Sequence, residues 1–314
     1  MSVKIVPGVY RHEQLVEFGL SAEQIEKLSR GGGLERLRRG WFATGGHDPA
    51  VAAAVKSGGA LSCVSALDSH GLWVAPGYAG TTHVRRSRKL ARKHGGGCHP
   101  YGCMPSVEGP VDPVALALEC ALHCMSEEDW IAVCDSACNT LGLAAEAMRA
   151  EMGALPEWAM RWFGKVEPAA QSGTESITRV RLRAAHYTVV VQPKIKDVGR
   201  SDLRIGRLVI ECDSETYHCD PESYRYDRQR DRKATAAGWI PFRLTYEDIL
   251  YGWEEVLADI RAITQADRHR IRGHAAMALK ESRRTGFESL KVAGSDEIAA
   301  ESVGDEFGSA EEFP

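Results

Sequence analysis

Apolar and polar positions in the first fifty residues predict two short helices. Leu15, Val16 and Phe18 form one apolar face, which Gly19 then ends. The pattern SAEQ at residues 21–24 is typical of a helix start. The Ser21 hydroxyl can accept from the backbone N–H of Gln24, and the Gln24 side chain can reach back. The second helix is expected to stop at the glycine run RGGG, residues 30–33.

The segment that follows predicts a basic hairpin. LERLRRGWFA, residues 34–43, alternates apolar residues with Arg36, Arg38 and Arg39. A capped helix followed by an arginine-rich hairpin is typical of a winged helix-turn-helix, in which helix and wing meet the backbone and groove of DNA. A small structural hairpin with solvated arginines is the alternative.

Residues 49–152 are rich in alanine and predict a mostly helical region, with a basic, β-like interlude from about 80 to 111. Leu118, Leu122 and Met125 are spaced i, i+4 and i+7, which indicates a face packed into a core. We interpret this region as a scaffold.

The pattern changes to alternating helices and strands beyond residues 165–173. We predict helices over 174–186, 222–237 and 246–263, and strands over 187–193, 203–206, 207–213 and 239–244. The polar, acidic segment after about residue 285 is expected to be disordered. The predicted domains are a winged helix-turn-helix over 1–48, a mostly helical domain over 49–152, a linker over 153–171, an α/β domain over 172–264, and a helical extension with an acidic tail over 265–314.

Composition narrows the class of protein. The chain has 314 residues, 44% of them hydrophobic and 26% charged, as in soluble globular proteins. No apolar run approaches the roughly 20 residues of a membrane helix, and the first residues lack the apolar core of a signal peptide. We therefore expect a cytoplasmic protein without a membrane partner.

Charge does not exclude a nucleic-acid partner. The net charge of -4 hides the strongly basic run HVRRSRKLARKH, residues 83–94. Such a run is usually a solvated face, but beside a wing it can contact phosphates. Arg85 and Arg86 join the wing arginines as predicted DNA contacts.

The nine cysteines are expected to be mostly buried thiols, because the cytosol does not favour disulfides. A zinc site is the alternative, although structural zinc sites favour closely spaced cysteine pairs. Here C-x₃-C spacing recurs on segments rich in alanine and leucine, where cysteine is an ordinary core residue. The cysteines with this spacing are Cys120 and Cys124, and Cys134 and Cys138, while Cys98 and Cys103 are separated by four residues.

The densest candidate chemistry lies in GRSDLRIGRLVIECDSETYH, residues 199–218. Asp202 opens one short apolar strand and Glu211 closes the next, so both are expected at one edge of a sheet. The backbone carbonyl of Cys212 lies between Glu211 and Asp213. Carboxylates and carbonyls are the ligands that Mg²⁺ or Mn²⁺ prefers, and such an ion activates water and neutralises a scissile phosphate.

The same segment resembles the very-short-patch-repair-like branch of the PD-(D/E)xK nuclease superfamily. The resemblance covers about residues 172–262 and implies a restriction-endonuclease-like α/β domain with a mixed sheet. Its motifs are SGTES at 172–176, Gln192, GRSD at 199–202, ECD at 211–213, YH at 217–218, DRQR at 227–230, AAGW at 236–239 and FRLTYEDI at 242–249.

The resemblance implies roles for individual residues. Asp202 and Glu211 would ligate the metal, and Glu175 would support a second cation or the water. His218 would donate or accept a proton near neutral pH. Arg230 would contact phosphate or fix a carboxylate.

The chain departs from this family at residue 213. The superfamily pattern has lysine there, whereas this chain has Asp213, which we group with the catalytic set. An aspartate cannot supply positive charge to the reacting groups. Arg200, in the GRSD motif, completes the predicted DNA contacts.

The front half resembles the abortive-infection type IV antitoxin family. The similarity rests on LVEFGLSAEQIEKLSRGGGLERLRRGWFA, residues 15–43, and implies a winged helix-turn-helix. Residues 60–150 look like the domain that follows it in that family.

We therefore predict a DNA-binding protein with a metal-dependent endonuclease domain that acts on double-stranded DNA. The alternative is an antitoxin-like transcriptional regulator with a decayed nuclease fold, for which a cognate toxin would be a partner. RNA or a damaged duplex as substrate, a homodimer, and a role in phage defence are left open. So are simpler roles: surface charges for Asp202 and Glu211, a structural hydrogen bond for His218, and an intrahelical ion pair between Asp227 and Arg230.

Overall fold

The computed structural model describes residues 5–78, 80–94, 96–196, 198–213, 221–265 and 269–270. These residues form a mixed α/β protein with several small sheets. Packing separates a unit of Met1–Ala262 from a second unit of Ile263–Pro314, and the predicted finer division stays a prediction. Within the described ranges, no helix is both long and apolar enough to cross a membrane.

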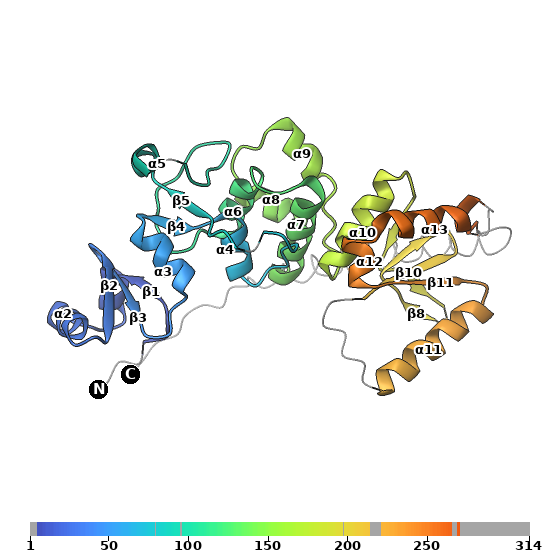
Figure 1. The fold of residues 1–314 in the computed structure, drawn as a ribbon, viewed down its shortest axis with the longest axis horizontal. Coiled ribbons are helices and arrows are strands. Elements are labelled where there is room, and N and C mark those ends of the chain that lie inside the picture. The colour runs from blue at the N-terminus through green and yellow to red at the C-terminus, as the bar shows by residue number, and fades with distance from the viewer. Residues whose placement is uncertain are drawn as a thin grey trace, which may run out of the picture. The chain divides into compact units, whose positions relative to one another are not determined.

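The N-terminal elements are the two helices and the hairpin that the pattern predicted, preceded by a short strand. Strand β3 lies between β1 and β2, and both pairings are antiparallel. The predicted capping box at Ser21 and Gln24 is present. The elements are β1 Val9–Arg11, α1 His12–Glu17, α2 Ala22–Arg30, β2 Leu34–Arg38 and β3 Trp41–Thr44 (Figure 1).

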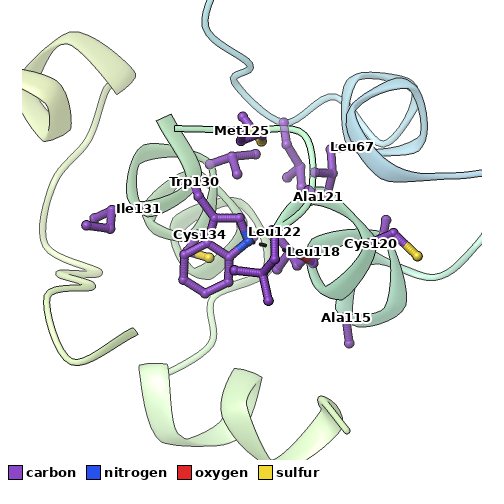
Figure 2. Close-up of a cluster of buried hydrophobic side chains, with 14 of the residues drawn as sticks. Leu67, Ala115, Leu118, Cys120, Ala121, Leu122, Met125, Trp130, Ile131 and Cys134 are labelled. Atoms are coloured by element: carbon purple, nitrogen blue, oxygen red, sulfur yellow. Dashed lines mark hydrogen bonds between the residues drawn. The ribbon is translucent and has the colours of Figure 1, made fainter. Parts of the chain in front are cut away.

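The middle region is mainly helical and has the largest apolar core. Trp130 is fully buried, and its indole N–H donates to the carbonyl of Leu118 at 2.9 Å (Figure 2). Leu122 and Met125 are buried as predicted, although the helix itself ends at Ala121. The elements are α3 Pro49–Lys56, β4 Gly59–Leu61, α4 Cys63–Ser69, β5 Val84–Arg86, α5 Arg88–His94, α6 Val114–Ala121, α7 Glu127–Leu141, α8 Ala145–Glu151 and α9 Glu157–Phe163.

The C-terminal region has a four-stranded mixed sheet in the order β11-β10-β9-β6. Strands β10 and β11 are parallel and the other pairs are antiparallel. The predicted helix 246–263 is interrupted at residues 251–252. The elements are α10 Gly173–Ala184, β6 Val190–Val191, β7 Lys194–Ile195, β8 Gly199–Arg200, β9 Leu203–Ile205, β10 Leu208–Cys212, α11 Pro221–Ala236, β11 Ile240–Leu244, α12 Tyr246–Leu250 and α13 Trp253–Gln265.

Helices cover both faces of this sheet. Figure 1 shows α11 on one side of β10 and β11, and α10 on the other. Val209 packs with Ala234 of α11, whereas the Cys212 thiol lies 3.6 Å from the Thr178 hydroxyl of α10. Because side chains alternate along a strand, Glu211 is on the α11 face with Val209.

Helix α10 is anchored to the middle region by a buried ion pair. Arg179 and Asp135 are 0% and 1% exposed in their side chains, and their charged atoms are 2.6 Å apart. Asp135 also accepts from the Ser176 hydroxyl at 2.6 Å. Removing one partner of such a buried pair destabilises the fold, because the other charge is left buried and unpaired. The pair therefore holds α10 in place against α7.

Candidate functional site

Asp202 and Glu211 lie at the same end of strands β9 and β10. The two strands pair antiparallel, and the last pair of the register is Leu203 opposite Ile210. Asp202 directly precedes β9, and Glu211 follows Ile210 in β10. The charge of Asp202 raises the pKa of Glu211, so the two carboxylates belong to one cluster.

Asp202 is held by the backbone of the neighbouring strand. Its Oδ2 accepts from the backbone N–H of Cys212 at 2.8 Å. Its Oδ1 lies 3.5 Å from the side-chain nitrogen of Gln192. The Asp202 carbonyl accepts from the Gln192 backbone N–H at 2.7 Å. These contacts fix the direction of the carboxylate.

Glu211 shares one carboxylate oxygen between two donors. Its Oε1 accepts from the Ser201 hydroxyl at 2.9 Å and from the Arg230 guanidinium of α11. The Glu211 side chain is 13% exposed and that of Arg230 is 20% exposed. Arg230 therefore contacts a carboxylate, and its predicted role at a phosphate stays a prediction.

Glu175 joins the same cluster through an amide. The Gln192 side chain donates to Glu175 Oε2 at 2.6 Å, and the backbone N–H of Gln171 donates to the same oxygen at 3.1 Å. Gln192 has a φ of 48°, a strained conformation for a residue other than glycine. This backbone places one amide between Glu175 and Asp202.

Burial raises the pKa of all three carboxyls, and a neighbouring carboxylate raises each one further, which for Asp202 is Asp213. Burial is the largest cause in each case. The charge of Asp202 further raises the pKa of Glu175 and Glu211. The pKa of Glu211 reaches about 7, despite the opposing effect of Arg230. Clustered carboxyls with raised pKa values are a feature of functional sites, because a cation relieves their repulsion.

Asp213 is paired with an arginine of the adjacent strand. Arg243 Nη1 lies 3.6 Å from Asp213 Oδ1, and Arg243 also binds Asp231 of α11 at 3.2 Å. Arg243 is opposite Glu211 in the parallel β10–β11 register, and its charge lowers the pKa of Glu211. Positive charge is therefore present beside the position where the family has lysine.

Some predicted residues cannot be placed. His218 lies outside the described residues, as does the side chain of Asp227, so the predicted proton carrier and the alternative ion pair with Arg230 stay predictions. The thiol of Cys212 is buried. The group of Cys212 that was predicted to bind the metal is its backbone carbonyl, not its sulfur.

The carboxylates do not form a tight ligand group by themselves. In the described part of the chain, one group of at least three Cys, His, Asp or Glu residues has all its ligand atoms within 4.8 Å of one another. That group lies in the middle region and consists of Cys63, His83, Cys98 and Cys124. Asp202 is close enough to Glu175 and to Glu211 to raise the pKa of both, but each of the three carboxylates is held by protein donors.

The hairpin of β2 and β3, which is the predicted wing, carries the predicted arginines at its surface. Arg36 and Arg39 are exposed, and Arg38 is half-buried. The Arg38 guanidinium lies over the Trp41 ring at 5.2 Å, and Arg11 lies over the same ring at 5.1 Å. Burial and the charge of Arg11 lower the pKa of Arg38.

Arg85 is not a DNA contact, contrary to the prediction. Its side chain is 1% exposed and forms a two-pronged ion pair with Asp112 at 2.6 and 2.7 Å. It also donates to the carbonyls of Pro105 and Ser106. Alternation along β5 explains the error, because the middle residue of the strand points into the core. Its neighbour Arg86 is half-buried and donates to the Ser57 hydroxyl at 3.2 Å.

Sequence reasoning missed several residues of the cluster. Ser201 and Arg243 were not singled out, and Gln192 was noted only as part of a motif. Their roles depend on strand register and on side-chain direction, which a single sequence does not display. Arg200 is at the surface on β8, and its carbonyl accepts from Arg230 at 2.9 Å.

A scan against models of protein families found no match, and searches of curated proteins and of solved structures found none either. The resemblances to the nuclease superfamily and to the antitoxin family therefore stay predictions.

Proposed function

We propose that this chain is a DNA-binding protein whose C-terminal α/β domain hydrolyses phosphodiester bonds with Mg²⁺ or Mn²⁺. The observation that supports it most directly is the cluster of buried carboxyls at the end of β9 and β10, where burial raises the pKa of Asp202 and Glu211 and the charge of Asp202 raises that of Glu211 further. A buried pair of carboxyls is costly unless a cation or a proton relieves it.

The donor set fits a hard divalent cation, because it consists of carboxylate oxygens and a backbone carbonyl. Asp202, Glu211 and the carbonyl of Cys212 would hold the ion, and Glu175 would support a second ion or the attacking water. The ion, when bound, lowers the pKa of water and neutralises charge on the scissile phosphate.

The residues around the carboxylates prepare them for this task. Gln192 and the N–H of Cys212 orient Asp202, while Ser201 orients Glu211. Arg230 balances the charge of Glu211 and can move to a substrate phosphate, for which a guanidinium is well suited. His218 carries the proton in the proposed reaction.

Arg243 offers a substitute for the missing lysine. It lies on the strand next to Glu211 and within 3.6 Å of Asp213. In this arrangement Asp213 orients the Arg243 guanidinium, and Arg243 supplies the positive charge that the lysine would supply. This arrangement supports a catalytic site despite the departure from the family pattern.

DNA would be held by the wing. Arg36 and Arg39 are exposed on the wing, and Arg38 is stacked on Trp41. Contacts from such arginines to phosphates give affinity that depends on salt, whereas sequence preference would come from the grooves.

Nicking of supercoiled plasmid in Mg²⁺, in Mn²⁺ and in EDTA tests the proposal. We expect the wild-type chain to cut only with a divalent ion, and Asp202→Asn to lose at least about a hundredfold in rate, as is common when a metal ligand or its support is removed. Asp259→Asn is a matched control, because Asp259 is an exposed aspartate on α13. Equal rates for the wild type and Asp202→Asn would refute the proposal.

A regulator without catalytic activity is the second candidate. It is favoured by the ion pairs that already satisfy Glu211 and Asp213 without a metal. Such a protein would protect a specific DNA segment in a footprinting experiment, with no cleavage in any divalent ion. A cognate toxin would then be its partner.

A further inference from the structure

The middle region brings together four residues from separate parts of the chain: Cys63, His83, Cys98 and Cys124. One ligand atom from each lies within 4.8 Å of every other. The Cys98 sulfur lies 3.5 Å from Nδ1 of His83. In tetrahedral zinc sites, Zn–S and Zn–N lengths of about 2.3 and 2.1 Å separate a sulfur and a nitrogen by about 3.6 Å. The observed separation therefore matches one edge of such a tetrahedron.

The four residues come from four separate segments of the backbone. Cys63 begins α4, His83 precedes β5, and Cys124 follows the end of α6. Cys98 is bound to the strand, because its N–H donates to the carbonyl of Val84 at 3.0 Å.

Hydrogen bonds hold His83 beside the start of α4. The backbone N–H of His83 donates to the Ser65 hydroxyl at 3.0 Å, and its backbone carbonyl accepts from the backbone N–H of Ser62 at 2.9 Å.

Cys63 provides a second, independent sign of a built site. It is fully buried and has a φ of 52°. A residue other than glycine rarely adopts this left-handed conformation, which persists only where the surroundings impose it. Here it occurs at the residue whose thiol completes the cluster.

We propose that Cys63, His83, Cys98 and Cys124 form a structural zinc site. Three thiolates and an imidazole are soft ligands that select zinc rather than the hard Mg²⁺ proposed for the carboxylates. Four protein ligands fill a tetrahedral shell, so the site is closed and structural rather than catalytic. On binding, each thiol releases its proton to solvent and no oxidation occurs.

The site has an entry path and a purpose within the fold. A pocket of about 330 Å³ is lined by His83, Cys98 and Cys124, together with Arg86, whose charge offsets the net negative charge of three thiolates around Zn²⁺. His83 and Cys98 flank the segment that contains the basic helix α5. Zinc would tie both ends of this segment to α4 and α6, so that metal binding stabilises the fold.

The test measures metal content in the full chain purified from zinc-supplemented medium. We expect about one zinc per chain in the wild type, as in other four-ligand sites. Cys98→Ser and Cys124→Ser should lose most of it. Cys103→Ser is the matched control, because Cys103 is an exposed cysteine outside the cluster. Asp202→Asn should keep its zinc, which separates this proposal from the nuclease proposal.

Cobalt substitution provides a measurement on the wild type, where no variant can misfold. Co²⁺ in the proposed site should give the intense visible bands of tetrahedral coordination and a thiolate-to-cobalt charge-transfer band. Weak octahedral bands would overturn the proposal. So would a wild-type protein that contains no zinc after purification from the supplemented medium and in which two of the three cysteines form a disulfide. Equal zinc loss in Cys103→Ser and Cys98→Ser would do the same.

Discussion

Arg230 of α11 and Ser201 donate to the same carboxylate oxygen of Glu211, so the guanidinium occupies one side of the group proposed to bind metal. The arginine keeps the pKa of Glu211 lower than burial and Asp202 alone would make it. Protonation of Glu211 and the Arg230 contact therefore both compete with a cation.

Replacing Arg230 should shift the pH dependence of cleavage. In the wild type, the rate should rise as pH increases through about 7, because Glu211 must lose its proton to bind metal. Arg230→Met removes a cause that lowers this pKa, so its rise should occur at higher pH. Nicking rates across pH values, with Asp259→Asn as control, measure the shift. If the nicking rate rose over the same pH range in the wild type and in Arg230→Met, the assignment of this titration to Glu211 would be contradicted.

Stability in the absence of metal should also depend on Glu211. Its folded pKa of about 7 lies above the ordinary value of 4.5 for this carboxyl. The stability linked to its proton is full below pH about 4.5 and is lost as pH rises through about 7, with a size of at most about 3 kcal/mol. Urea unfolding should show a steeper loss in the wild type than in Glu211→Gln over this interval. Parallel curves for the two proteins would argue against a raised pKa.

Removing Arg85 should unfold the middle region rather than weaken DNA binding directly. Arg85→Met leaves Asp112 buried without its partner, which should lower the free energy of unfolding by about 3–5 kcal/mol. Arg39→Ala, at an exposed position, should change it by less than about 0.5 kcal/mol. Urea denaturation compares the two variants. A loss below about 1 kcal/mol for Arg85→Met would show that the pair is not structurally important.

The wing arginines should account for part of the salt dependence of DNA binding. Each phosphate contact contributes about 0.9 to the slope of log affinity against log salt. Arg36→Ala with Arg39→Ala should therefore reduce the slope by up to about 2, while Arg161→Ala on α9 should leave it unchanged. Fluorescence anisotropy with a short duplex gives both slopes. An unaltered slope in the double variant would exclude the wing as a phosphate contact.

Gly173 should not tolerate a methyl group. A Cβ at this residue would lie 1.9 Å from Cδ2 of Trp73, so Gly173→Ala forces the ring or the start of α10 to move. The cost should be about 1–3 kcal/mol, as for other overpacked cores. Gly45→Ala meets nothing within 4 Å and is the control for thermal unfolding. Equal melting temperatures of the two variants would mean that α10 is free to shift.

Local features could be predicted because neighbouring residues determine them. The capping box at Ser21 and Gln24 is present. The order of β9, β10, α11 and β11 also agrees with the strands and helix expected over residues 203–244. These features depend on hydrogen bonds and periodicity within a few residues, which the chain displays directly.

Even the candidate carboxylates were accessible only in part. Asp202 and Glu211 could be named because they stand at the ends of two short apolar stretches, in a segment that resembles the nuclease motifs. The donors around them could not be named, because Arg230 and Arg243 reach the cluster from a different helix and strand.

By itself, the sequence determined the two N-terminal helices with their hairpin and the order of α10, β9, β10, α11 and β11, because short-range periodicity decides them. Only the tertiary structure decided that Arg85 is buried with Asp112 and that Cys63, His83, Cys98 and Cys124 meet. The cluster residues are separated by 14 to 25 intervening residues, far beyond the local spacing of familiar zinc motifs. The packing of α4, β5 and α6 around one core brings them together, and no local pattern records that packing.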